Sequence, residues 1–453
     1  MSTQVSLQEM LQARERRVQH QQKLLQQYHC PLICFTMNIA GPVKDSPLIR
    51  RGFARGQQLL GQQLLRAGIA SLHTDVFMEA TGCEAFYVLD ADPLAIKRIT
   101  TAVEDADLLG RLFDMDVLCP DGRKVDREEL HLEGRRCLIC GGPAKVCSSR
   151  RIHPVAQLQQ KTAAILTEAV AAGDAARIAR QAVRALLYEV ATTPKPGLVD
   201  RRNSGSHRDM DFFTFLDSAA ALAPYFEACA RAGQATADRS APETLAALRP
   251  LGCRAEGEML AATGGVNTHK GAIFSVGITC GALGRLEPTL WSHPDRVLEE
   301  VAAMTKGLTQ QELAGVTARN AATTGQKLYA LYGITGVRGQ VEAGLPAVLA
   351  HGLPVLEKGL ALGCSMDRAG SAALLEILAH STDTNIIARS DRQRQQRLVG
   401  ELRELLARTP YPDPEALCRL DDDFIAENLS PGGSADLLAL TYLLHFFKEE
   451  DHG

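Results

Sequence analysis

A glycine-led stretch in the second half of the chain combines residue types that bind phosphate and move protons. Residues 264–274 read GGVNTHKGAIF. The two glycines predict a tight turn, and the Asn or Thr that follows can cap a helix whose apolar face starts at Ile273. The start of such a helix carries unpaired N–H groups and the positive end of the dipole, which together attract phosphate. An ordinary capped helix after a loop explains the same pattern, so both interpretations stay open.

A second pair of segments places similar residue types in loops before a helix. Residues 192–200 read TTPKPGLVD, and residues 203–211 read NSGSHRDMD. These segments and residues 264–274 collect Gly, Lys, His, Asp and Asn at junctions between loops and helices. A purely structural loop rarely needs all of these types, whereas phosphate, metal and proton-transfer chemistry uses them. We therefore expect a functional site in the second half of the chain.

Asp114 and Asp116 stand two residues apart in the stretch GRLFDMDV, residues 110–117. An Asp-Gly pair shortly downstream favours a hairpin turn, so we expect a short strand here. Residues two apart on a strand face the same side, which places both carboxylates on one face. A Mg²⁺ ion that bridges substrate phosphates would relieve their repulsion. A solvated strand edge is the alternative, and the preceding Gly-Arg pair, which ends at Arg111, favours the metal site.

Three cysteines and a histidine form a possible zinc set: Cys137, Cys140, Cys147 and His153. Only one CxxC pair is present, and the closing cysteine and histidine are loosely spaced for a zinc module. Free thiols are therefore favoured, and zinc stays open as the alternative. The chain has 12 cysteines scattered along its length. We expect most of them to be reduced, buried thiols rather than a disulfide framework.

Two more polar segments lie at helix junctions in the second half. The segment HSTDTN ends one expected helix, and the segment NLSPGGSAD opens the last one. The second segment is another helix start of the phosphate-binding type. Asp436 is ordinary as an acid at a helix start, but together with Asp383 and the NSGSHRDMD loop it could bind Mg²⁺. Asp217, in an apolar helical stretch, is expected to be a buried polar group with a hydrogen-bond partner.

Length and charge limit the kinds of protein that fit the sequence. With 453 residues, of which 45% are hydrophobic, the chain is long enough for two or three domains with full-sized cores. Its formal net charge of −4 argues against general nucleic-acid binding, which needs a basic surface. No apolar run approaches the ~20 residues of a membrane span, and the Gln- and Arg-rich start lacks the apolar core of a secretory signal. We expect a cytoplasmic protein with neither nucleic acid nor a membrane as its partner.

Hydrophobic periodicity divides the chain into two parts, with a boundary near 155. The helices and strands expected before it are 1–28, 46–67 and 93–105 for helices, and 31–38, 69–78, 84–90 and 109–117 for strands. Almost every later segment has helical spacing, with Gly, Pro and Asn between the segments. One of the helices expected there spans 241–249. The sequence therefore predicts an α/β or α+β N-terminal domain, residues 1–155, followed by a larger all-α helical-bundle domain, residues 156–453.

The motifs of the second half resemble the triphosphoribosyl-dephospho-coenzyme A synthase family over positions of about 165–450. They are TTPKPGLVD, GSHRDMDFFTF, GGVNTHKGAIF, DTNIIAR and NLSPGGSADLLA. Residues from about 10 to 155 resemble the phosphoribosyl-dephospho-coenzyme A transferases, the citrate lyase holo-carrier-protein synthases, through TMNIAGPVK, TGCEAFYV and GRLFDMDV. The chain thus resembles a bifunctional fusion. The sequence departs from the family's motif after Arg389, where Ser and Asp stand in place of the expected glycines. This difference argues against a phosphate-binding loop at that position, while Asp383 and Asn385 still match the motif.

The resemblance implies two consecutive reactions. The helical half would join ATP and 3′-dephospho-coenzyme A with loss of adenine. The N-terminal half would then transfer the phosphoribosyl-dephospho-coenzyme A unit to a serine of the citrate lyase acyl carrier (gamma) subunit, with release of pyrophosphate. The implied partners are therefore this subunit and small-molecule nucleotides, with ATP and 3′-dephospho-coenzyme A as substrates, and we infer Mg²⁺ as the metal ion.

The residues singled out above fit the first of these reactions. The departing adenine needs a proton, and the oxocarbenium-like centre needs negative charge nearby. The expected metal ligands or base are Asp209, Asp211, Asp383 and Asp436. We expect His207 or His269 to donate the proton, because imidazole titrates near neutral pH. The groups expected to hold ATP and its phosphates are Lys195, Gly264, Gly265, Asn267, Thr268, Lys270, Asn385, Arg389, Gly432 and Gly433.

The paired carboxylates fit the second reaction. Mg²⁺ on Asp114 and Asp116 would neutralise the charge that develops as a carrier serine attacks phosphorus and pyrophosphate leaves. Arg111 and Lys44 are the expected cationic helpers.

Two other functions use the same residues. A Mg²⁺-dependent glycohydrolase of the ADP-ribose type would cleave the glycosidic bond with water as the acceptor. A non-catalytic nucleotide-binding regulatory protein would bind ATP without releasing adenine. Two separate Asp clusters, together with histidines at loop–helix junctions, favour an enzyme over a pure binder.

Overall fold

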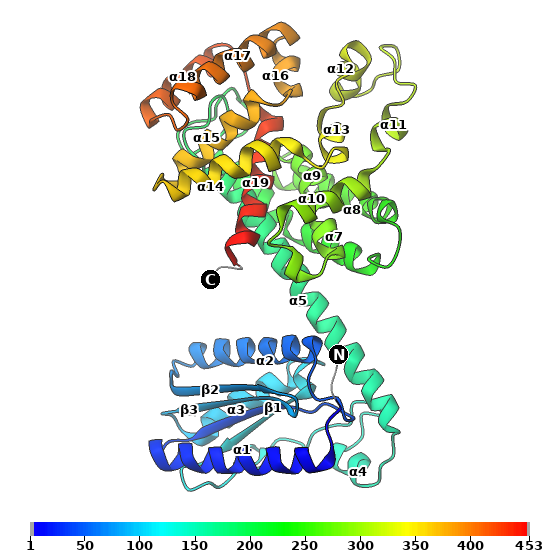
Figure 1. Cartoon of the computed structure of the whole chain (residues 1–453), viewed down its shortest axis with the longest axis vertical. Coiled ribbons are helices and arrows are strands. Elements are labelled where there is room, and N and C mark those ends of the chain that lie inside the picture. The colour runs from blue at the N-terminus through cyan, green and yellow to red at the C-terminus, as the bar shows by residue number, and fades with distance from the viewer. Residues whose placement is uncertain (1–3, 451–453) are drawn as a thin grey trace. The chain divides into compact units, whose positions relative to one another are not determined.

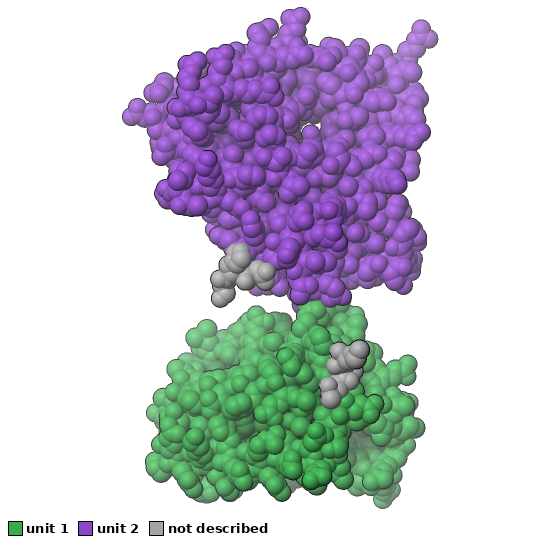
Figure 2. All heavy atoms as spheres, viewed as in Figure 1, with its two compact units in different colours: residues 1–172 green, residues 173–453 purple. Residues whose placement is uncertain are grey.

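The chain folds as two compact units, residues 1–172 and 173–453 (Figure 2). The structure is a computed structural model and describes residues 4–450. The units divide inside the long helix α5 (Val155–Ala191), whereas we expected a boundary near 155, where this helix begins. Its early turns pack into the core of the first unit through Ile165 and Leu166.

A four-stranded antiparallel sheet forms the centre of the first unit, with strand order β2-β3-β1-β4. Its strands are β1 (Leu32–Met37), β2 (Ser71–Glu79), β3 (Gly82–Leu89) and β4 (Phe113–Leu118). All four were predicted from the sequence, with β4 inferred from the Asp-Gly turn that follows it. Because every neighbouring pair is antiparallel, the fold is α+β in character and lacks the parallel strands of a doubly wound sheet.

Helices pack on both faces of this sheet (Figure 1). The helices of the first unit are α1 (Leu7–Tyr28), α2 (Pro47–Arg66), α3 (Pro93–Asp105) and the short α4 (Ala144–Ser149), with 3-10 turns η1 (Gly110–Leu112) and η2 (Arg127–Leu130). Leu24 and Leu25 of α1 form a small cluster with one face of β1 and β3. The main core lies on the other face, where α2 and α3 pack against Phe35 and Phe113.

The second unit is helical throughout its described residues, as the sequence predicted (Figure 1). Its α-helices after α5 are α6 (Phe212–Ala221), α7 (Ala223–Ala235), α8 (Ala241–Ala262), α9 (Lys270–Arg285), α10 (Pro294–Thr305), α11 (Leu308–Leu313), α12 (Thr324–Tyr332), α13 (Gly336–Glu342), α14 (Leu353–Ala361), α15 (Met366–Ala379), α16 (Thr384–Arg389), α17 (Arg392–Arg408), α18 (Pro414–Ala426) and α19 (Gly432–Glu450). Short turns η3 (Pro288–Leu290) and η4 (Val348–Gly352) complete it.

Helices α9, α15 and α19 are the most deeply buried elements of this unit. Nearly all of the residues from Leu437 to Phe447 on α19 are buried, so this helix is apolar on every side and lies in the core. α9 and α15 both pack against it. Within residues 4–450, no helix is both long and apolar enough to cross a membrane.

Two expectations for the helical unit were wrong. The helix expected at 241–249 continues through Pro250 to Ala262 as α8, because Leu248, Ala255 and Met259 bury one face on both sides of the proline. Asp217 is exposed on α6 rather than buried. Its polar side chain therefore needs no protein partner, since water can solvate it.

Candidate active sites

The two carboxylates of β4 face the same side of the sheet, as predicted. Phe113, Met115 and Val117 alternate with them and are fully buried in the main core. In the register of the sheet, Asp114 lies opposite Thr36 and Asp116 opposite Cys34 on β1. The carboxylates therefore project from the face on which α1 packs, at the edge strand. α1 contacts β1 and β3, so the edge is where a substrate can approach.

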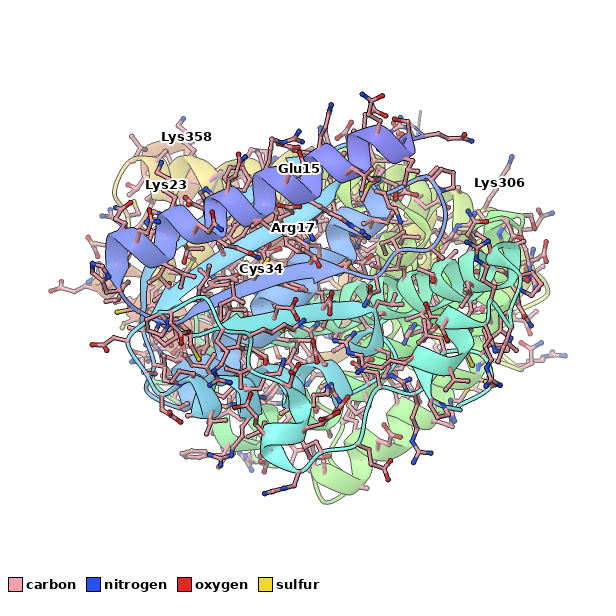
Figure 3. All side chains as sticks on the ribbon, turned by 90° about the horizontal axis from the view of Figure 1, so that it is seen from below. Glu15, Arg17, Lys23, Cys34, Lys306 and Lys358 are labelled. Atoms are coloured by element: carbon pink, nitrogen blue, oxygen red, sulfur yellow. The ribbon has the colours of Figure 1, made fainter. Side chains whose placement is uncertain are left out.

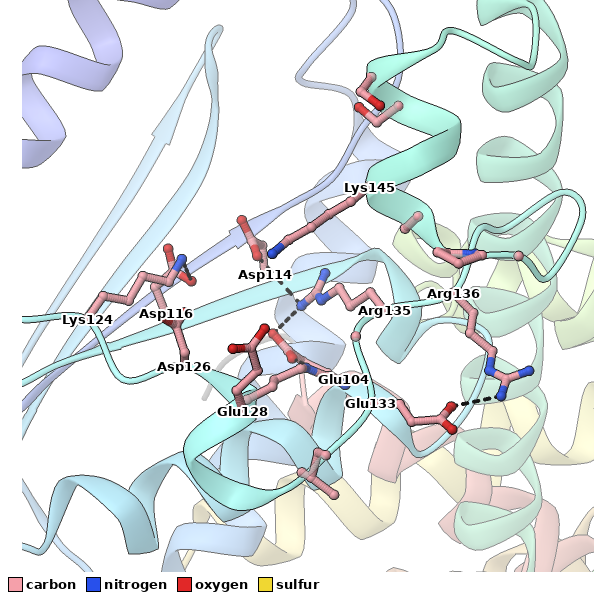
Figure 4. Close-up of a pocket in the computed structure, with 18 of the residues that line it drawn as sticks. Glu104, Asp114, Asp116, Lys124, Asp126, Glu128, Glu133, Arg135, Arg136 and Lys145 are labelled. Carbon is pink, nitrogen blue, oxygen red and sulfur yellow. Dashed lines mark hydrogen bonds and ion pairs between the residues drawn. The ribbon is translucent and has the colours of Figure 1, made fainter.

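Cations surround the carboxylate pair (Figure 4). Lys124 Nζ lies 2.6 Å from Asp116 Oδ1, and Arg135 Nη2 lies 3.6 Å from Asp114 Oδ1. Arg135 also pairs with Glu104 of α3, and Lys145 of α4 extends toward Asp114 (Figure 4). These ion pairs balance the charge of the two carboxylates in part.

Glu104 is the residue that fixes β4 under this site. Only 2% of it is exposed, and it accepts a hydrogen bond from the backbone N–H of Met115 at 2.7 Å. It also pairs with Arg127 at 2.8 Å and with Arg135. Glu104, Lys124, Arg135 and Lys145 were not predicted as site residues from the sequence. For Lys124, the position just after the predicted hairpin turn is a signal that could have revealed it.

Burial and like charge both act on Asp114. Burial raises its pKa above the ordinary value, and repulsion from Asp116 raises it further, while Arg135 opposes both effects. A divalent cation would remove this repulsion, and two carboxylates beside open space are typical ligands for Mg²⁺. The donor set therefore fits the expected metal ion.

Two cavities of the first unit meet at Asp114. One has a volume of about 1190 Å³ and contains both carboxylates, Glu104 and Lys124. The other, of about 710 Å³, extends from Asp114 toward α1. We call the second one the cationic cavity because of the basic residues that line it: Arg14, Arg17, Lys44, Arg111, Arg135, Arg136 and Arg151.

The cationic cavity contains both of the expected cationic helpers, Lys44 and Arg111. Lys44 donates to the backbone carbonyl of Ile39, and burial followed by repulsion from Arg14 lowers its pKa. Arg17 points from α1 toward the sheet, near Cys34 of β1 (Figure 3), and its charge is balanced by Glu84. The cationic cavity contains more positive than negative side chains, and this excess of positive charge would lower the free energy of a bound polyphosphate.

In the second unit, Lys195 lies in a buried ion pair. Lys195 is 1% exposed, and its amine bonds to Glu189 near the end of α5, which is also buried. Asp200 accepts a hydrogen bond from the Lys195 N–H at 2.8 Å and another from the Arg202 N–H at 2.6 Å, so it shapes the loop. Lys195 was a predicted site residue, whereas Glu189 was not, because it lies in an Ala-rich helix with no local motif around it.

His269 is buried with one free ring nitrogen. It is 3% exposed, and its Nδ1 lies 2.7 Å from the hydroxyl of Ser218 on α6. Its Nε2 has no partner in the protein. Burial, followed by the charge of Lys195, lowers the pKa of His269 to about 3. The imidazole is therefore neutral at pH 7 and is a poor proton donor, in contrast to our expectation.

The glycine turn ends one helix instead of starting the next. Gly264 and Gly265 have φ values of 64° and 93°, and the Gly265 N–H donates to the Leu260 carbonyl at 2.7 Å, which closes the C-terminus of α8. This N–H is therefore occupied and cannot bind phosphate as expected. The residue that precedes α9 is His269, and neither Asn267 nor Thr268 is its N-cap.

Other residues of the same stretch also have protein partners. Asn267 accepts a hydrogen bond from the Lys270 N–H at 3.3 Å, so its side chain satisfies one backbone donor at the start of α9. Thr268 donates to Ser218 at 2.8 Å. The amine of Lys270 is exposed and lies 2.8 Å from Glu256. The free polar atom of this stretch that points into the protein is thus the Nε2 of His269.

Asp436 approaches the first turn of α9 very closely. A Cβ atom at Gly271 would lie 1.9 Å from Asp436 Oδ2, so only glycine leaves room for this carboxylate. Burial raises the pKa of Asp436 well above its ordinary value, and repulsion from Glu189 and then Asp383 raises it further. The Ala272 N–H opposes this shift. Asp436 is therefore protonated over a wider pH range than a free carboxyl.

Asp383 joins the starts of two helices. Its Oδ1 accepts from the Asn385 N–H at 2.9 Å and caps α16, while its Oδ2 accepts from the N–H and the hydroxyl of Ser434 at 2.7 and 2.9 Å. Gly432 and Gly433 pack against Asn385 and Asp383. The oxygens of Asp383 already have four donors counting Ile386, so the residue is better suited to aligning α16 and α19 than to binding a metal ion.

His207 and Arg389 form a separate polar pair. His207 Nε2 lies 2.9 Å from the Ser430 hydroxyl, and Arg389 Nη2 lies 3.3 Å from His207 Nδ1. Burial, followed by the charge of Arg389, lowers the pKa of His207. Arg389 also donates to the Ser206 carbonyl at 3.0 Å. This arginine therefore ties the NSGSHRDMD loop to α16.

Asp209 and Asp211 are exposed in the loop before α6. Asp211 is the N-cap of that helix and accepts from the N–H and the hydroxyl of Thr214, at 2.9 and 2.8 Å. These bonds lower its pKa, with the Thr214 N–H as the largest cause. The same helix presents Phe215 and Ser218 to His269, so Asp211 lies one turn away from the buried cluster.

Lys195, Glu189 and His269 are buried, and Asp436, which lies against the first turn of α9, is partly exposed. We call these four residues the buried cluster. The link between them is partly electrostatic: Lys195 lowers the pKa of His269, and Glu189 raises that of Asp436. Glu189 and Lys195 come from α5 and the loop after it, His269 directly precedes α9, and Asp436 lies in α19. A carboxyl with a raised pKa beside a neutral imidazole and a buried cation provides groups that can move a proton.

The first unit thus places paired carboxylates beside a cationic cavity, and the second contains a carboxyl with a raised pKa, a neutral imidazole and a buried cation. Residues 5–169 match the family model of apo-citrate lyase phosphoribosyl-dephospho-CoA transferase. Residues 175–452 match that of ATP:dephospho-CoA triphosphoribosyl transferase. The chain belongs to these two transferase families and joins both in one polypeptide, which gives it a bifunctional role in making the citrate lyase prosthetic group.

Two relatives match along nearly the whole chain, and a third matches over a little more than half of it. The chain is similar to Protein CitXG of Haemophilus influenzae, with 35% identity over 98% of this chain and 97% of the relative. It is 33% identical to Protein CitXG of Leuconostoc mesenteroides subsp. cremoris, with 97% of each chain covered. A 2-(5″-triphosphoribosyl)-3′-dephosphocoenzyme-A synthase of Pectobacterium atrosepticum is 43% identical over 60% of this chain and 90% of its own length.

Proposed function

We propose that the buried cluster of the second unit makes 2′-(5″-triphosphoribosyl)-3′-dephospho-coenzyme A, and that the carboxylate site of the first unit transfers its phosphoribosyl part to the citrate lyase acyl carrier (gamma) subunit. One observation carries this proposal: each of the two family matches covers a different unit, and the two units contain chemically different candidate sites. ATP and 3′-dephospho-coenzyme A are the substrates of the first step.

In the first step, a ribose hydroxyl of dephospho-coenzyme A displaces adenine from C1′ of the ATP ribose. The C1′–N9 bond breaks, a C1′–O bond forms, the hydroxyl loses its proton and adenine gains one. Asp436 is the best candidate for the proton donor, because its pKa is raised while that of His269 is lowered. The free Nε2 of His269 is suited to a hydrogen bond with a ribose hydroxyl.

In the second step, a serine hydroxyl of the carrier attacks the phosphorus next to the ribose. A P–O bond to serine forms, the serine hydroxyl loses its proton to solvent, the bond to the β-phosphate breaks, and pyrophosphate leaves. Asp114 and Asp116 would hold Mg²⁺, which supplies positive charge where negative charge develops. Residues of the cationic cavity, among them Lys44 and Arg111, orient the triphosphate of the intermediate.

A two-stage assay tests the proposal. The full chain is mixed with ATP, 3′-dephospho-coenzyme A and Mg²⁺, and free adenine is measured by chromatography. Apo-carrier is then added, and its mass increase and the released pyrophosphate are measured. Adenine release that requires dephospho-coenzyme A supports the proposal. Adenine release without it, with free triphosphoribose as the product, would indicate a glycohydrolase, and ATP binding without adenine release would indicate a regulatory protein.

A further inference from the structure

Residues 135–153 of the first unit form a small module that the carboxylate site does not explain. A tight turn brings Ala144 N–H to the Arg135 carbonyl at 2.8 Å and Cys137 N–H to the Gly142 carbonyl at 2.6 Å. α4 follows, and a turn with Arg151 at φ 47° leads to His153. The module contains few apolar side chains, and although Leu138 packs against the main core, the module has no core of its own.

Three sulfur atoms and one imidazole nitrogen converge inside this module. Ligand atoms of Cys137, Cys140, Cys147 and His153 all lie within 4.8 Å of one another. The sulfurs of Cys140 and Cys147 are 3.5 Å apart. Tetrahedral zinc with Zn–S bonds of about 2.3 Å separates its sulfur ligands by about 3.8 Å, so the observed spacing fits zinc with small shifts.

The backbone around Cys137 is arranged to stabilise a thiolate. The Ile139 N–H donates to the Cys137 sulfur at 3.4 Å, and Gly141 has a φ of 72°, which lets the turn close directly after Cys140. Zinc binds cysteine as the thiolate, and ligand sulfurs commonly accept such hydrogen bonds.

The histidine gives an independent observation. His153 Nε2 is buried and has no hydrogen-bond partner in the protein, although it lies beside the three sulfurs. An unsatisfied buried nitrogen costs free energy. A disulfide would use two of the three sulfurs and leave the third thiol and this nitrogen without a partner. A four-coordinate metal ion uses all four atoms at once.

We propose that Cys137, Cys140, Cys147 and His153 bind one zinc ion as a closed structural site. Four protein ligands leave no position for water or substrate, so this ion holds the module together and takes no part in the reaction. The sequence favoured free thiols because the spacing from Cys140 to Cys147 and His153 is loose. In the structure, α4 and the turn after it occupy the residues between Cys140 and His153, and they place Cys147 and His153 beside the CxxC pair.

The zinc module supplies one wall of the cationic cavity. Arg135 and Arg136 directly precede Cys137, and Arg111 donates to the Arg136 carbonyl. Arg135 reaches Asp114 and Glu104 from this wall. Loss of zinc would therefore release the cations that face Asp114, and transfer to the carrier would decrease while adenine release in the second unit would not change.

Metal analysis of the full chain, purified under reducing conditions, tests the site directly. We expect about one zinc per chain, released by a mercurial thiol reagent and detected with a zinc-binding dye. After replacement with Co²⁺ we expect the intense thiolate-to-cobalt and d–d absorption bands of a tetrahedral Cys3His site. Protein with adenine-releasing activity that holds no zinc, even after incubation with Zn²⁺ and reductant, would overturn the proposal.

Variants show whether these four residues are the ligands. Cys147→Ser and the milder His153→Ala should lose most of the zinc and show reduced carrier transfer, with adenine release as an internal measure that the second unit is folded. Cys30→Ser, in the same unit but outside the module, is the matched control and should keep the zinc. Full zinc content in Cys147→Ser and His153→Ala, or loss of zinc in Cys30→Ser, would refute the assignment. The metal content tests the zinc site independently of the proposed function.

Discussion

The carboxylate site of the first unit and the buried cluster of the second hold their charges in different ways. Asp114 and Asp116 lie on one strand, and their direction follows from the two-residue period of β4. The buried cluster takes its residues from α5, the loop after it, the start of α9 and α19, and Lys195, Glu189 and His269 are almost fully removed from water. The site on β4 therefore lies at an open edge among cationic side chains, whereas the site assembled by helices uses burial to shift pKa values.

This difference suits the two reactions. Transfer of a phosphoryl group from a small intermediate to a protein serine needs an accessible edge, where cations and a metal ion stabilise charge. Exchange at an anomeric carbon needs an acid that is protonated near neutral pH, which burial of a carboxyl among other acids provides. Each of the following predictions tests one side of this contrast.

The largest effect is expected for Asp436→Asn. If Asp436 donates the proton to adenine, its amide should reduce adenine release by about 10²–10⁴-fold. The wild-type rate should fall as pH rises through the raised pKa of Asp436, and the variant should lose this dependence. Both are measured by adenine chromatography across pH, with Asp238→Asn, an exposed acid of the same unit, as the control. A variant with the normal rate and pH profile would exclude Asp436 as the acid.

Asp114→Ala should reduce carrier transfer by about 10²–10³-fold, because charge at the leaving pyrophosphate loses its metal ligand. Adenine release should be unchanged, because the second unit contains the other site. Carrier mass and adenine are measured in the same reaction, with Glu15→Ala on the exposed side of α1 as the control. A parallel decrease in both activities would contradict the separation of the two sites.

Lys195→Ala should destabilise the protein by about 3–5 kcal/mol, because it leaves Glu189 as a buried, unpaired charge. Unfolding by denaturant, followed by circular dichroism, measures this change. The double variant Glu189→Leu/Lys195→Met should recover most of the stability while adenine release stays low. Full activity in the double variant would show that the pair is structural only.

Asp436→Asn should also make the protein more stable, and increasingly so at higher pH. The folded state keeps the Asp436 proton at pH values where an unfolded carboxyl, with a pKa of about 3.9, has lost it, so ionisation of Asp436 destabilises the fold as pH rises through its raised pKa. The gain in Tm should therefore grow from pH 5 to pH 8, with about 2–4 °C for each kcal/mol. A constant difference between the two pH values would contradict the raised pKa.

The smallest effects are expected for alanine substitutions at three glycines, which should differ in their effect on adenine release and on stability. Gly271→Ala places a Cβ against the Asp436 carboxylate and should reduce adenine release by about tenfold, since one displaced contact costs about 1–2 kcal/mol. Gly264→Ala should cost about 1–2 kcal/mol in stability through its positive φ and leave adenine release unchanged. Gly257→Ala, at an open position of α8, is the control for both. Lost adenine release in Gly264→Ala with normal stability would restore the phosphate-binding interpretation of the turn.

The strands of the first unit were predictable because alternation is a local property. The same period gave the common face of Asp114 and Asp116. Their partners Glu104, Lys124 and Arg135 were not predictable, since α3, the hairpin after β4 and the zinc module reach these carboxylates only when the unit folds. The separation of two residues along the sequence does not predict contacts of this kind.

The helical unit was predictable in class but not in the roles of its polar residues. Gly264 and Gly265 look like a helix start in sequence, yet their positive φ values close the helix before them. Asp383 looks like a metal ligand, yet helix N–H groups take up its oxygens. In both cases the neighbouring backbone, which a sequence pattern does not specify, decided the partner. The assignment of catalytic roles in this unit stays a prediction.

By itself, the sequence determined the succession of strands and helices, the common direction of the β4 carboxylates and the two family memberships, because these depend on periodicity and on motifs that are continuous in the chain. Only the tertiary structure decided which groups share a low-dielectric environment: Glu189 beside Lys195, Asp436 against Gly271, and His153 among three sulfurs. Burial and distance set charge state and metal binding, and both are properties of the packed chain.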